Sequence, residues 1–130
     1  MERTYKYRIY PNKMQQTLIQ QTFGCCRFVY NYFLDLRISE YRDNKKSLSY
    51  NEMSKLLTQL KKEHEWLKEP DKDSLQKSLK NLDIAYQKFF KEHSGFPKFK
   101  SKKNRYKSYR TSCTNNNIRF ENKLIKLPKL

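Results

Sequence analysis

The sequence predicts an α+β fold, in which a small antiparallel bundle of three or more helices follows a first β-strand and precedes short C-terminal strands. Three observations predict it. Residues 4–10 alternate apolar or aromatic side chains with polar or basic ones, as a strand does. Three separate helix-start signals precede stretches that are apolar on one side only. Beyond His93, short alternating segments separated by turn residues replace the helical spacing.

The first strand and the first helix meet at Pro11. The strand would cover residues 4–10, and Pro11 would end it. Asn12 and Gln15 have the spacing of a capping box, so a helix should begin there and run to about Arg42. Residues at three- and four-residue steps would form its buried stripe: Leu18, Thr22, Cys25, Val29, Phe33 and Leu36.

Two more capping boxes predict two more helices. Ser49 with Glu52 precedes the stripe Met53, Leu56, Leu57 and Leu60, and Asp73 with Gln76 opens the stripe Leu75, Leu79, Leu82, Tyr86 and Phe89. Asp71 and Asp73 also have the spacing of a metal-binding pair. At a helix start, however, carboxylates favour the positive end of the helix dipole. Capping is therefore the preferred interpretation, and we expect no metal ion or other cofactor.

The C-terminal part predicts short strands. Residues 117–121 and 123–127 alternate apolar and polar side chains, and Asn122 would join them as a hairpin. A further short strand is expected at residues 108–111. Leu124 blurs the register, because it places an apolar side chain on each face of the second strand.

Charge is the strongest functional signal. The chain carries 29 Lys and Arg against 13 Asp and Glu, a net charge of +16. Residues 93–130 hold eleven of these cations and a single acid, Glu121. Such an imbalance costs stability through self-repulsion, so a polyanionic partner explains it best. An acidic membrane surface is a weaker alternative, because no segment pairs a basic face with a continuous apolar one.

The basic loop, residues 96–110, concentrates this charge. Four rings are interleaved with its cations: Phe96, Phe99, Tyr106 and Tyr109. Cations neutralise phosphates, and rings between them stack on bases or pack into the core, an alternative that the sequence leaves open. A solvated basic loop is the competing interpretation. The predicted backbone-binding residues are Lys98, Lys100, Lys102, Lys103, Arg105, Lys107 and Arg110.

Other chemistry is poorly represented. Two glycines exclude a glycine-rich phosphate loop, and the two histidines lack metal-ligand spacing. Cys25, Cys26 and Cys113 form no disulfide framework and are expected to be reduced and mostly buried. No apolar stretch is long enough for a membrane span. We expect a soluble cytoplasmic protein, associated with the nucleoid when bound, and find no catalytic constellation.

Seven segments together resemble the N-terminal region of the TnpB family, also called OrfB, the RNA-guided nucleases of bacterial insertion sequences. They are YKYRIYPN, FGCCRFVYNYF, SLSYNEMSKLL, DSLQKSLKNLDIAYQKFF, GFPKFKSKK, SYRT and NIRFENKLIKLPKL, in the same order over almost the whole chain. The resemblance implies that residues 1–11 form the first strand of a partial wedge-type barrel. Residues 12–92 would form an inserted helical recognition lobe, and residues 93–130 the basic loop and further barrel strands.

The resemblance also implies partners and contacts. A guide RNA, its RNA–DNA heteroduplex and target DNA would bind this region, with base pairing to the guide reading the target. Contacts to the DNA motif beside the target would fall on Tyr50, Ser54, Lys72, Gln76, Thr114 and Asn115. Gln76 suits bidentate contact with an adenine edge, and Lys72 suits a base acceptor or a phosphate. Alternatives stay open, because Gln76 could serve its capping box and Tyr50 could be a core ring.

The chain departs from the family pattern in its extent. The carboxylate nuclease domain and zinc site of TnpB have no counterpart in it, so we expect no cleavage by this chain alone. Two other interpretations remain. The chain could be a stand-alone helix-turn-helix-like DNA-binding regulator, or one part of a split nuclease whose catalytic half is a separate chain.

Overall fold

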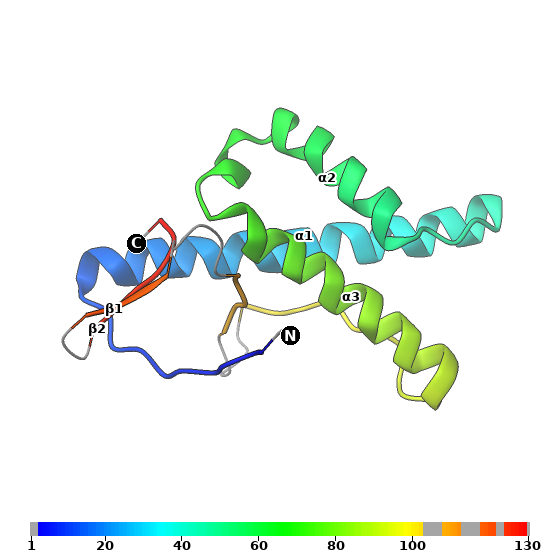
Figure 1. The fold of residues 1–130 in the computed structure, drawn as a ribbon. Helices are drawn as coiled ribbons and strands as arrows, with labels where there is room; N and C mark the ends of the chain where they lie inside the picture. The colour runs from blue at the N-terminus through cyan, green and yellow to red at the C-terminus, as the bar shows by residue number, and fades with distance from the viewer. Residues whose placement is uncertain (1–2, 103–107, 113–117, 122–123, 130) are drawn as a thin grey trace.

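The computed structural model describes residues 3–102, 108–112, 118–121 and 124–129. Three α-helices carry the architecture, and α3 crosses α1 obliquely while contacting α2 as well (Figure 1). In chain order the elements are α1 (Lys13–Asn44), α2 (Tyr50–Glu63), the 3₁₀ helix η1 (Glu65–Lys68), α3 (Lys72–Glu92), β1 (Arg119–Glu121) and β2 (Leu124–Lys126). The predicted combination of a helical bundle with short C-terminal strands is confirmed.

The first two helices begin where their capping boxes predict. The backbone N–H of Gln15 donates to Asn12 Oδ1 over 2.9 Å, and the backbone N–H of Asn12 donates to Gln15 Oε1 over 3.0 Å. Ser49 and Glu52 make the same reciprocal pair at the start of α2. Each box satisfies donors that a helix end otherwise leaves without a partner. At its other end α1 stops at Lys45, whose left-handed φ of 53° closes the last turn.

The third helix begins two residues earlier than predicted, so the Asp73–Gln76 capping box is wrong. Asp71 is the N-cap, and its Oδ1 accepts from the backbone N–H of Ser74 over 3.1 Å. The same oxygen accepts from the Thr111 hydroxyl over 2.8 Å. Thr111 lies forty residues away in sequence, so local spacing could not reveal this anchor. Gln76 is thereby left outside the cap and can serve another contact.

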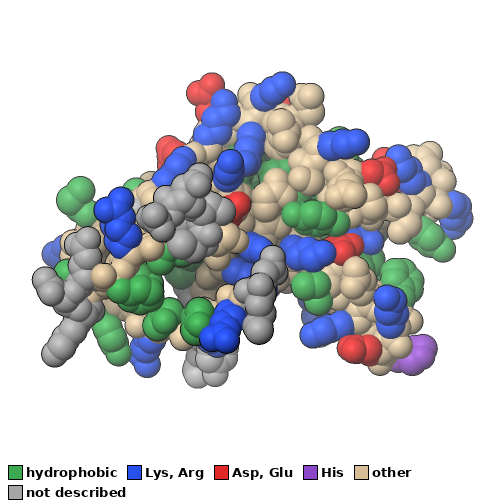
Figure 2. Space-filling view, viewed as in Figure 1, with side chains coloured by type: hydrophobic (Ala, Val, Ile, Leu, Met, Phe, Trp, Pro, Cys, Tyr) green, Lys and Arg blue, Asp and Glu red, His purple; other side chains and the backbone are tan. Residues whose placement is uncertain are grey.

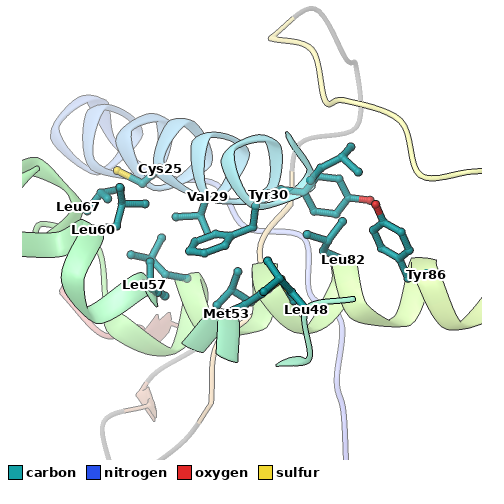
Figure 3. Packing of buried hydrophobic residues seen from close by; sticks show 14 residues of the cluster. Cys25, Val29, Tyr30, Leu48, Met53, Leu57, Leu60, Leu67, Leu82 and Tyr86 are labelled. Atoms are coloured by element: carbon teal, nitrogen blue, oxygen red, sulfur yellow. The ribbon is translucent and has the colours of Figure 1, made fainter. Parts of the chain in front are cut away.

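The core lies between α1 on one side and α2, η1 and α3 on the other (Figure 3). Its buried members are Cys25, Val29, Tyr30, Phe33, Leu34, Leu48, Met53, Leu57, Leu60, Leu67, Leu75, Leu79, Leu82 and Tyr86. Two predicted stripe positions are exposed instead, Leu18 and Leu56, whereas Ile19 and Leu67 are buried. Each fully buried aliphatic side chain contributes roughly 1.5–3 kcal/mol relative to an exposed one.

A buried arginine joins α1 to α3. Arg37 is 8% exposed, and its guanidinium lies 3.8 Å from the centre of the Tyr86 ring. Its Nη1 is 3.5 Å from Asp83 Oδ1, whose other oxygen accepts from Gln87 Nε2 over 2.9 Å. A buried cation requires such compensation, because losing its water shell is costly. Arg37 therefore acts as a tertiary bracket inside a mostly apolar interface.

The predicted first strand is absent from the described residues 3–12, which form no backbone ladder. Tyr5 and Tyr7 are exposed, and the Tyr7 ring meets Phe120 of β1 with centroids 5.7 Å apart. The alternating pattern was correct for an extended segment. A strand also needs a neighbouring strand with which to form backbone hydrogen bonds. In the described residues, β1 contacts this segment through the Phe120 ring and not through backbone pairing.

The C-terminal hairpin is confirmed in shortened form. β1 and β2 pair antiparallel, with Phe120 opposite Ile125. Leu124 is exposed and Ile125 is half-buried, so the hairpin turns Ile125 toward the protein. The predicted joint at Asn122 lies outside the described residues. Residues 108–111 are not a strand, because Thr111 is instead held by the cap of α3. The wedge-type barrel stays a prediction.

Candidate nucleic-acid interface

Three of the six predicted motif-contacting residues converge on one polar cluster. The hydroxyls of Tyr50 and Ser54, both on α2, each donate to Gln76 Oε1 on α3 over 3.1 Å. Tyr50 is half-buried with its ring packed against the core, as the core-ring alternative predicted, and its contact with DNA stays a prediction. We call these three residues the hydroxyl–amide cluster. With Oε1 accepting two bonds, the Gln76 amide has a fixed orientation, and its Nε2 donates to no other described residue.

Lysines flank the hydroxyl–amide cluster on both sides. Lys80 Nζ, one turn further along α3, lies 5.0 Å from the Tyr50 ring centre. Lys72 is exposed at the first residue of α3, one turn before Gln76. Burial lowers the pKa of Lys61, and the charges of Lys129 and Lys72 lower it further, whereas the Asp71 and Asp73 carboxylates partly offset these effects. Lys61 therefore lies near two cations and near two acids at the start of α3.

The C-terminal end of the described chain contributes to this basic region through a direct contact. Lys129 Nζ donates to the carbonyl of Lys68 in η1 over 2.8 Å. Lys61, Lys80 and Lys129 were not among the predicted site residues. No local pattern distinguishes them from other solvated lysines, because packing alone brings Lys80 to the Tyr50 ring and Lys61 near Lys72 and Lys129.

The basic loop is fastened to α1 by one asparagine. Asn31 Nδ2 donates to the Lys100 carbonyl over 3.0 Å, and the Lys100 backbone N–H donates to Asn31 Oδ1 over 2.7 Å. Lys100 Nζ then lies 4.6 Å from the centre of the Tyr30 ring. Asn31 lies in the segment FGCCRFVYNYF, and no role was predicted for it. The signal available was a polar side chain between two rings of a helix.

The three described rings of the basic loop differ in their contacts with the helices. Phe96 packs edge-on against Tyr86 and Phe89 of α3, with centroids 5.4 and 5.2 Å away. Tyr109 packs edge-on against Phe23 of α1, and burial raises its pKa to about 12. Phe99 is 54% exposed. Phe96 and Tyr109 therefore hold the loop against the helices. Phe96, which is 43% exposed, and Phe99 both keep surface on which a base could stack.

The predicted backbone-binding cations are partly described. Lys98, Lys100, Lys102 and Arg110 are exposed. Lys and Arg side chains spread over the visible face of the molecule and outnumber the acidic ones there (Figure 2). Five predicted site residues lie outside the described residues: Lys103, Arg105, Lys107, Thr114 and Asn115.

The acidic pair and the helices give two further results. Asp71 serves as the cap of α3, as preferred over metal binding, and the described residues contain no grouping of three His, Cys, Asp or Glu arranged to hold a metal ion. None of the described helices has the length and apolarity that crossing a bilayer requires.

Two described cysteines are structural. Cys25 Sγ lies 3.8 Å from the Trp66 carbonyl, and Cys26 Sγ lies 3.6 Å from the Ser74 carbonyl, so each thiol faces a carbonyl acceptor in the core. Both are free thiols. Burial raises the pKa of Cys25 from 9.0 to about 11 and that of Cys26 from 9.0 to about 12. They therefore stay protonated at neutral pH. Cys113 lies outside the described residues.

Alkaline pH should destabilise the fold through these thiols. The folded pKa values lie above the ordinary value, so the folded state keeps protons that the unfolded chain releases. The contribution is fully present below about pH 9 and is lost as pH rises toward 11–12. Urea unfolding at pH 7.5, 9 and 10.5 should show this decline. The double variant Cys25→Ala/Cys26→Ala should decline less steeply, and an equal slope would contradict the assignment.

Comparison with known proteins identifies a domain family for the N-terminal part of the chain. Residues 1–46 match a domain family described as a helix-turn-helix domain. The matched span contains the extended segment and α1, and it ends at the turn before α2. In the described part of that span, therefore, α1 stands without a second helix, and any helix-turn-helix pairing would have to draw on α2.

Three relatives cover most of this chain. A candidate RNA-guided DNA endonuclease of Streptomyces pristinaespiralis is 37% identical over 105 residues, which are 79% of this chain and 26% of that protein. InsQ of Escherichia coli (strain K12), another candidate RNA-guided DNA endonuclease, is 33% identical over 100 residues, 75% of this chain and 25% of that protein. The virulence protein VsdF of Salmonella dublin is 34% identical over 113 residues, 78% of this chain and 95% of that protein.

These matches define a class, proteins that carry a helix-turn-helix domain of the OrfB type. The chain belongs to the TnpB/OrfB family and corresponds to its N-terminal region. It spans about a quarter of the length of the two endonuclease relatives.

Proposed function

We propose that this chain is the nucleic-acid-binding module of a transposon-associated, RNA-guided DNA endonuclease. In this role it holds guide RNA and RNA–DNA heteroduplex and reads the DNA motif beside the target, without cutting DNA itself. Its partners are guide RNA, target DNA and, where it is a separate chain, the nuclease half. The observation that carries the proposal is the hydroxyl–amide cluster of Tyr50, Ser54 and Gln76, set between lysines on a chain of net charge +16.

The cluster supports motif reading through the orientation of one amide. Tyr50 and Ser54 occupy Gln76 Oε1, so Nε2 is the group left to meet a base. An amide donor recognises an acceptor on a base edge, such as N7 of a purine or O4 of thymine, and it finds none at that position of cytosine. Bidentate contact with adenine would need Oε1 to exchange a hydroxyl for the base amino group. Lys72 and Lys80 would meet phosphates on either side.

The basic loop supports heteroduplex binding by charge and shape. Lys98, Lys100 and Lys102 form an exposed cationic run that Asn31 fixes to α1, so the charges have a defined place when nucleic acid arrives. Phosphate contacts of this kind set position and supply affinity, whereas base contacts set preference. Thr114 and Asn115 remain proposed motif contacts on the resemblance alone.

A binding selection tests the proposal. The purified chain is mixed with an RNA–DNA heteroduplex that continues into a DNA duplex of randomised flanking sequence, and the bound fraction is sequenced. Gln76→Ala should lose base preference at one or two flanking positions, a change of roughly tenfold or more in discrimination. Lys72→Ala should weaken binding to all sequences about equally, as a phosphate contact does.

Matched controls lie on the same helix. Gln87→Ala and Lys88→Ala change exposed residues of the same types, several turns from the cluster, and should leave preference and affinity unaltered. If Gln76→Ala keeps the full flanking preference, the motif-reading role is wrong. Sequence-specific binding to plain duplex by RNase-treated protein would favour the stand-alone regulator. Metal-dependent cleavage by the pure chain would overturn the assignment of binding without cutting.

A further inference from the structure

An exposed group of rings from α1, η1 and the residue before η1 shares no member with the hydroxyl–amide cluster. Phe28 and Tyr32 of α1 stack with centroids 5.8 Å apart, and Trp66 of η1 meets Phe28 edge-on at 4.9 Å. His64 lies 5.5 Å from Trp66. Trp66 is 42% exposed and Tyr32 is 40% exposed, so these rings have surface left over after packing.

A hollow of about 470 Å³ opens beside Trp66. Its walls include Gln21, Arg27 and Phe28 from α1 and Trp66 with Glu69 from the other side. Gly24 lines it without a side chain, and the nearest atom that a Cβ there would meet is Arg27 Nη2 at 3.8 Å. The hollow is therefore lined by two aromatic rings, a guanidinium and two side chains able to hydrogen-bond a flat polar ligand. We call it the Trp66 hollow.

The chemistry of the Trp66 hollow suits an unpaired base. Stacking on an aromatic ring is tolerant of base identity, because every base presents a flat π-face. Arg27 lies where the phosphate of a stacked nucleotide could be neutralised, and Lys129 reaches the carbonyl of Lys68, two residues beyond Trp66. The Gln21 amide can donate to or accept from a base edge, and the Glu69 carboxylate can accept from one, although Glu69 would repel a phosphate placed directly against it.

We propose that the Trp66 hollow takes one unpaired nucleobase of a single strand, with Trp66 as the stacking ring and Arg27 as the phosphate contact. The inference rests on the proposed nucleic-acid-binding function and adds a site to it. Single-stranded RNA and single-stranded DNA both present unpaired bases with a flat face that could stack here. A duplex, whose bases are already stacked, should not enter.

The chain contains one tryptophan, so its fluorescence reports on this hollow alone. Four dye-labelled ligands of equal length are titrated into the full chain at low salt: oligo-dT, oligo-U, an abasic single strand and a duplex. Anisotropy reports binding, and tryptophan emission reports stacking. All four should bind through their phosphates, whereas only the two base-bearing single strands should quench Trp66. A difference between them would show whether RNA or DNA is preferred.

Variants separate stacking from folding. Trp66→Leu should weaken oligo-dT binding about tenfold relative to the abasic strand, and Trp66→Phe should recover most of the loss. Arg27→Gln keeps the reporter and should weaken base-dependent quenching. Tyr41→Leu removes an exposed ring near the far end of α1 and should change nothing. Thermal unfolding by circular dichroism identifies a variant that has lost the fold. If a Trp66 variant has done so, base-dependent quenching of the wild-type chain and of Arg27→Gln tests the site instead.

The outcomes distinguish this inference from the proposed function. Binding of all ligands with equal quenching by the abasic strand would overturn the base site and leave the proposed function standing. Equal oligo-dT affinities of Trp66→Phe and Trp66→Leu, measured by anisotropy, would also overturn it. Absence of binding to any ligand would sink the proposed function itself. Protection of Trp66 from acrylamide that grows with protein concentration alone would show that a second copy covers the face, and would overturn the base site.

Discussion

Raising monovalent salt from about 50 to about 200 mM should weaken binding of a heteroduplex or duplex by at least about 10³-fold. Each phosphate contact releases condensed counterions and adds about 0.9 to the slope of log affinity against log salt. Six contacts would therefore produce a change of this size over a fourfold rise in salt. The basic loop and the first half of α3 offer that many exposed cations: Lys72, Lys80, Lys98, Lys100, Lys102 and Arg110.

A charge-matched pair of variants locates the contacts. Replacing Lys98, Lys100 and Lys102 together with Gln should lower the slope by about 2–3, as expected for lost phosphate contacts. Replacing Lys45, Lys55 and Lys91 with Gln removes the same net charge from exposed positions in α2, in α3 and at the end of α1, and should leave the slope nearly unchanged. Fluorescence anisotropy over a salt series measures both. A flat salt response of the wild-type chain would refute an electrostatic nucleic-acid interface.

Replacing Arg37 with Ala should lower the free energy of unfolding by about 2–4 kcal/mol. The change removes the guanidinium from the Tyr86 ring and leaves the Asp83 carboxylate, only 15% exposed, without its cation. Removing one partner of a buried ion pair is costly chiefly because the remaining charge stays desolvated. Arg37→Lys should recover only part of the loss, since an ammonium group lacks the flat face that covers the ring.

Arg42 provides the matched control for Arg37. It lies on the same helix and pairs with Asp43 over 3.1 Å, but both side chains are largely exposed, so Arg42→Ala should leave stability unchanged within error. Urea unfolding followed by circular dichroism measures each variant. An Arg37→Ala chain that unfolds at the wild-type urea concentration would show that the bracket between α1 and α3 adds nothing to stability.

The helices were predictable from the sequence because their signals are local. A capping box acts across three residues, and a buried stripe repeats every three or four, so the starts of α1 and α2 and most core positions follow directly. The two errors in the stripes, Leu18 and Leu56, lie where the neighbouring elements do not reach. The hairpin of β1 and β2 was equally local.

The remaining errors have non-local causes. The start of α3 moved to Asp71, where Thr111 from the basic loop region supplies a second hydrogen bond. Residues 4–10 have the alternation of a strand, but pairing depends on which edge lies beside them, and Tyr7 meets Phe120 by ring contact instead. Buried Arg37 was not expected on a core face, because its partners Asp83 and Tyr86 lie on another helix.

In the candidate site, too, the residue types were predicted from the sequence, whereas their contacts required the structure. The resemblance named Tyr50, Ser54 and Gln76 individually, whereas only the structure joins them, across 26 and 22 residues of sequence, into one hydrogen-bonded cluster. It also adds Asn31, which is 69 residues from the Lys100 backbone that it holds. Residue types therefore indicated the chemistry, and packing decided which groups of each side chain are occupied.

By itself, the sequence determined the net charge of +16, the positions of the helices and the concentration of cations after His93, because composition and short-range spacing are properties of the chain alone. Only the tertiary structure decided that Gln76 is freed from capping, that Phe96 and Tyr109 pack edge-on against rings of the helices, and that Trp66 borders an open hollow. Each of these outcomes depends on which residues from distant parts of the sequence lie next to the side chain. A side chain can hydrogen-bond or pack in only one place at a time, and the tertiary fold sets which partners are within reach.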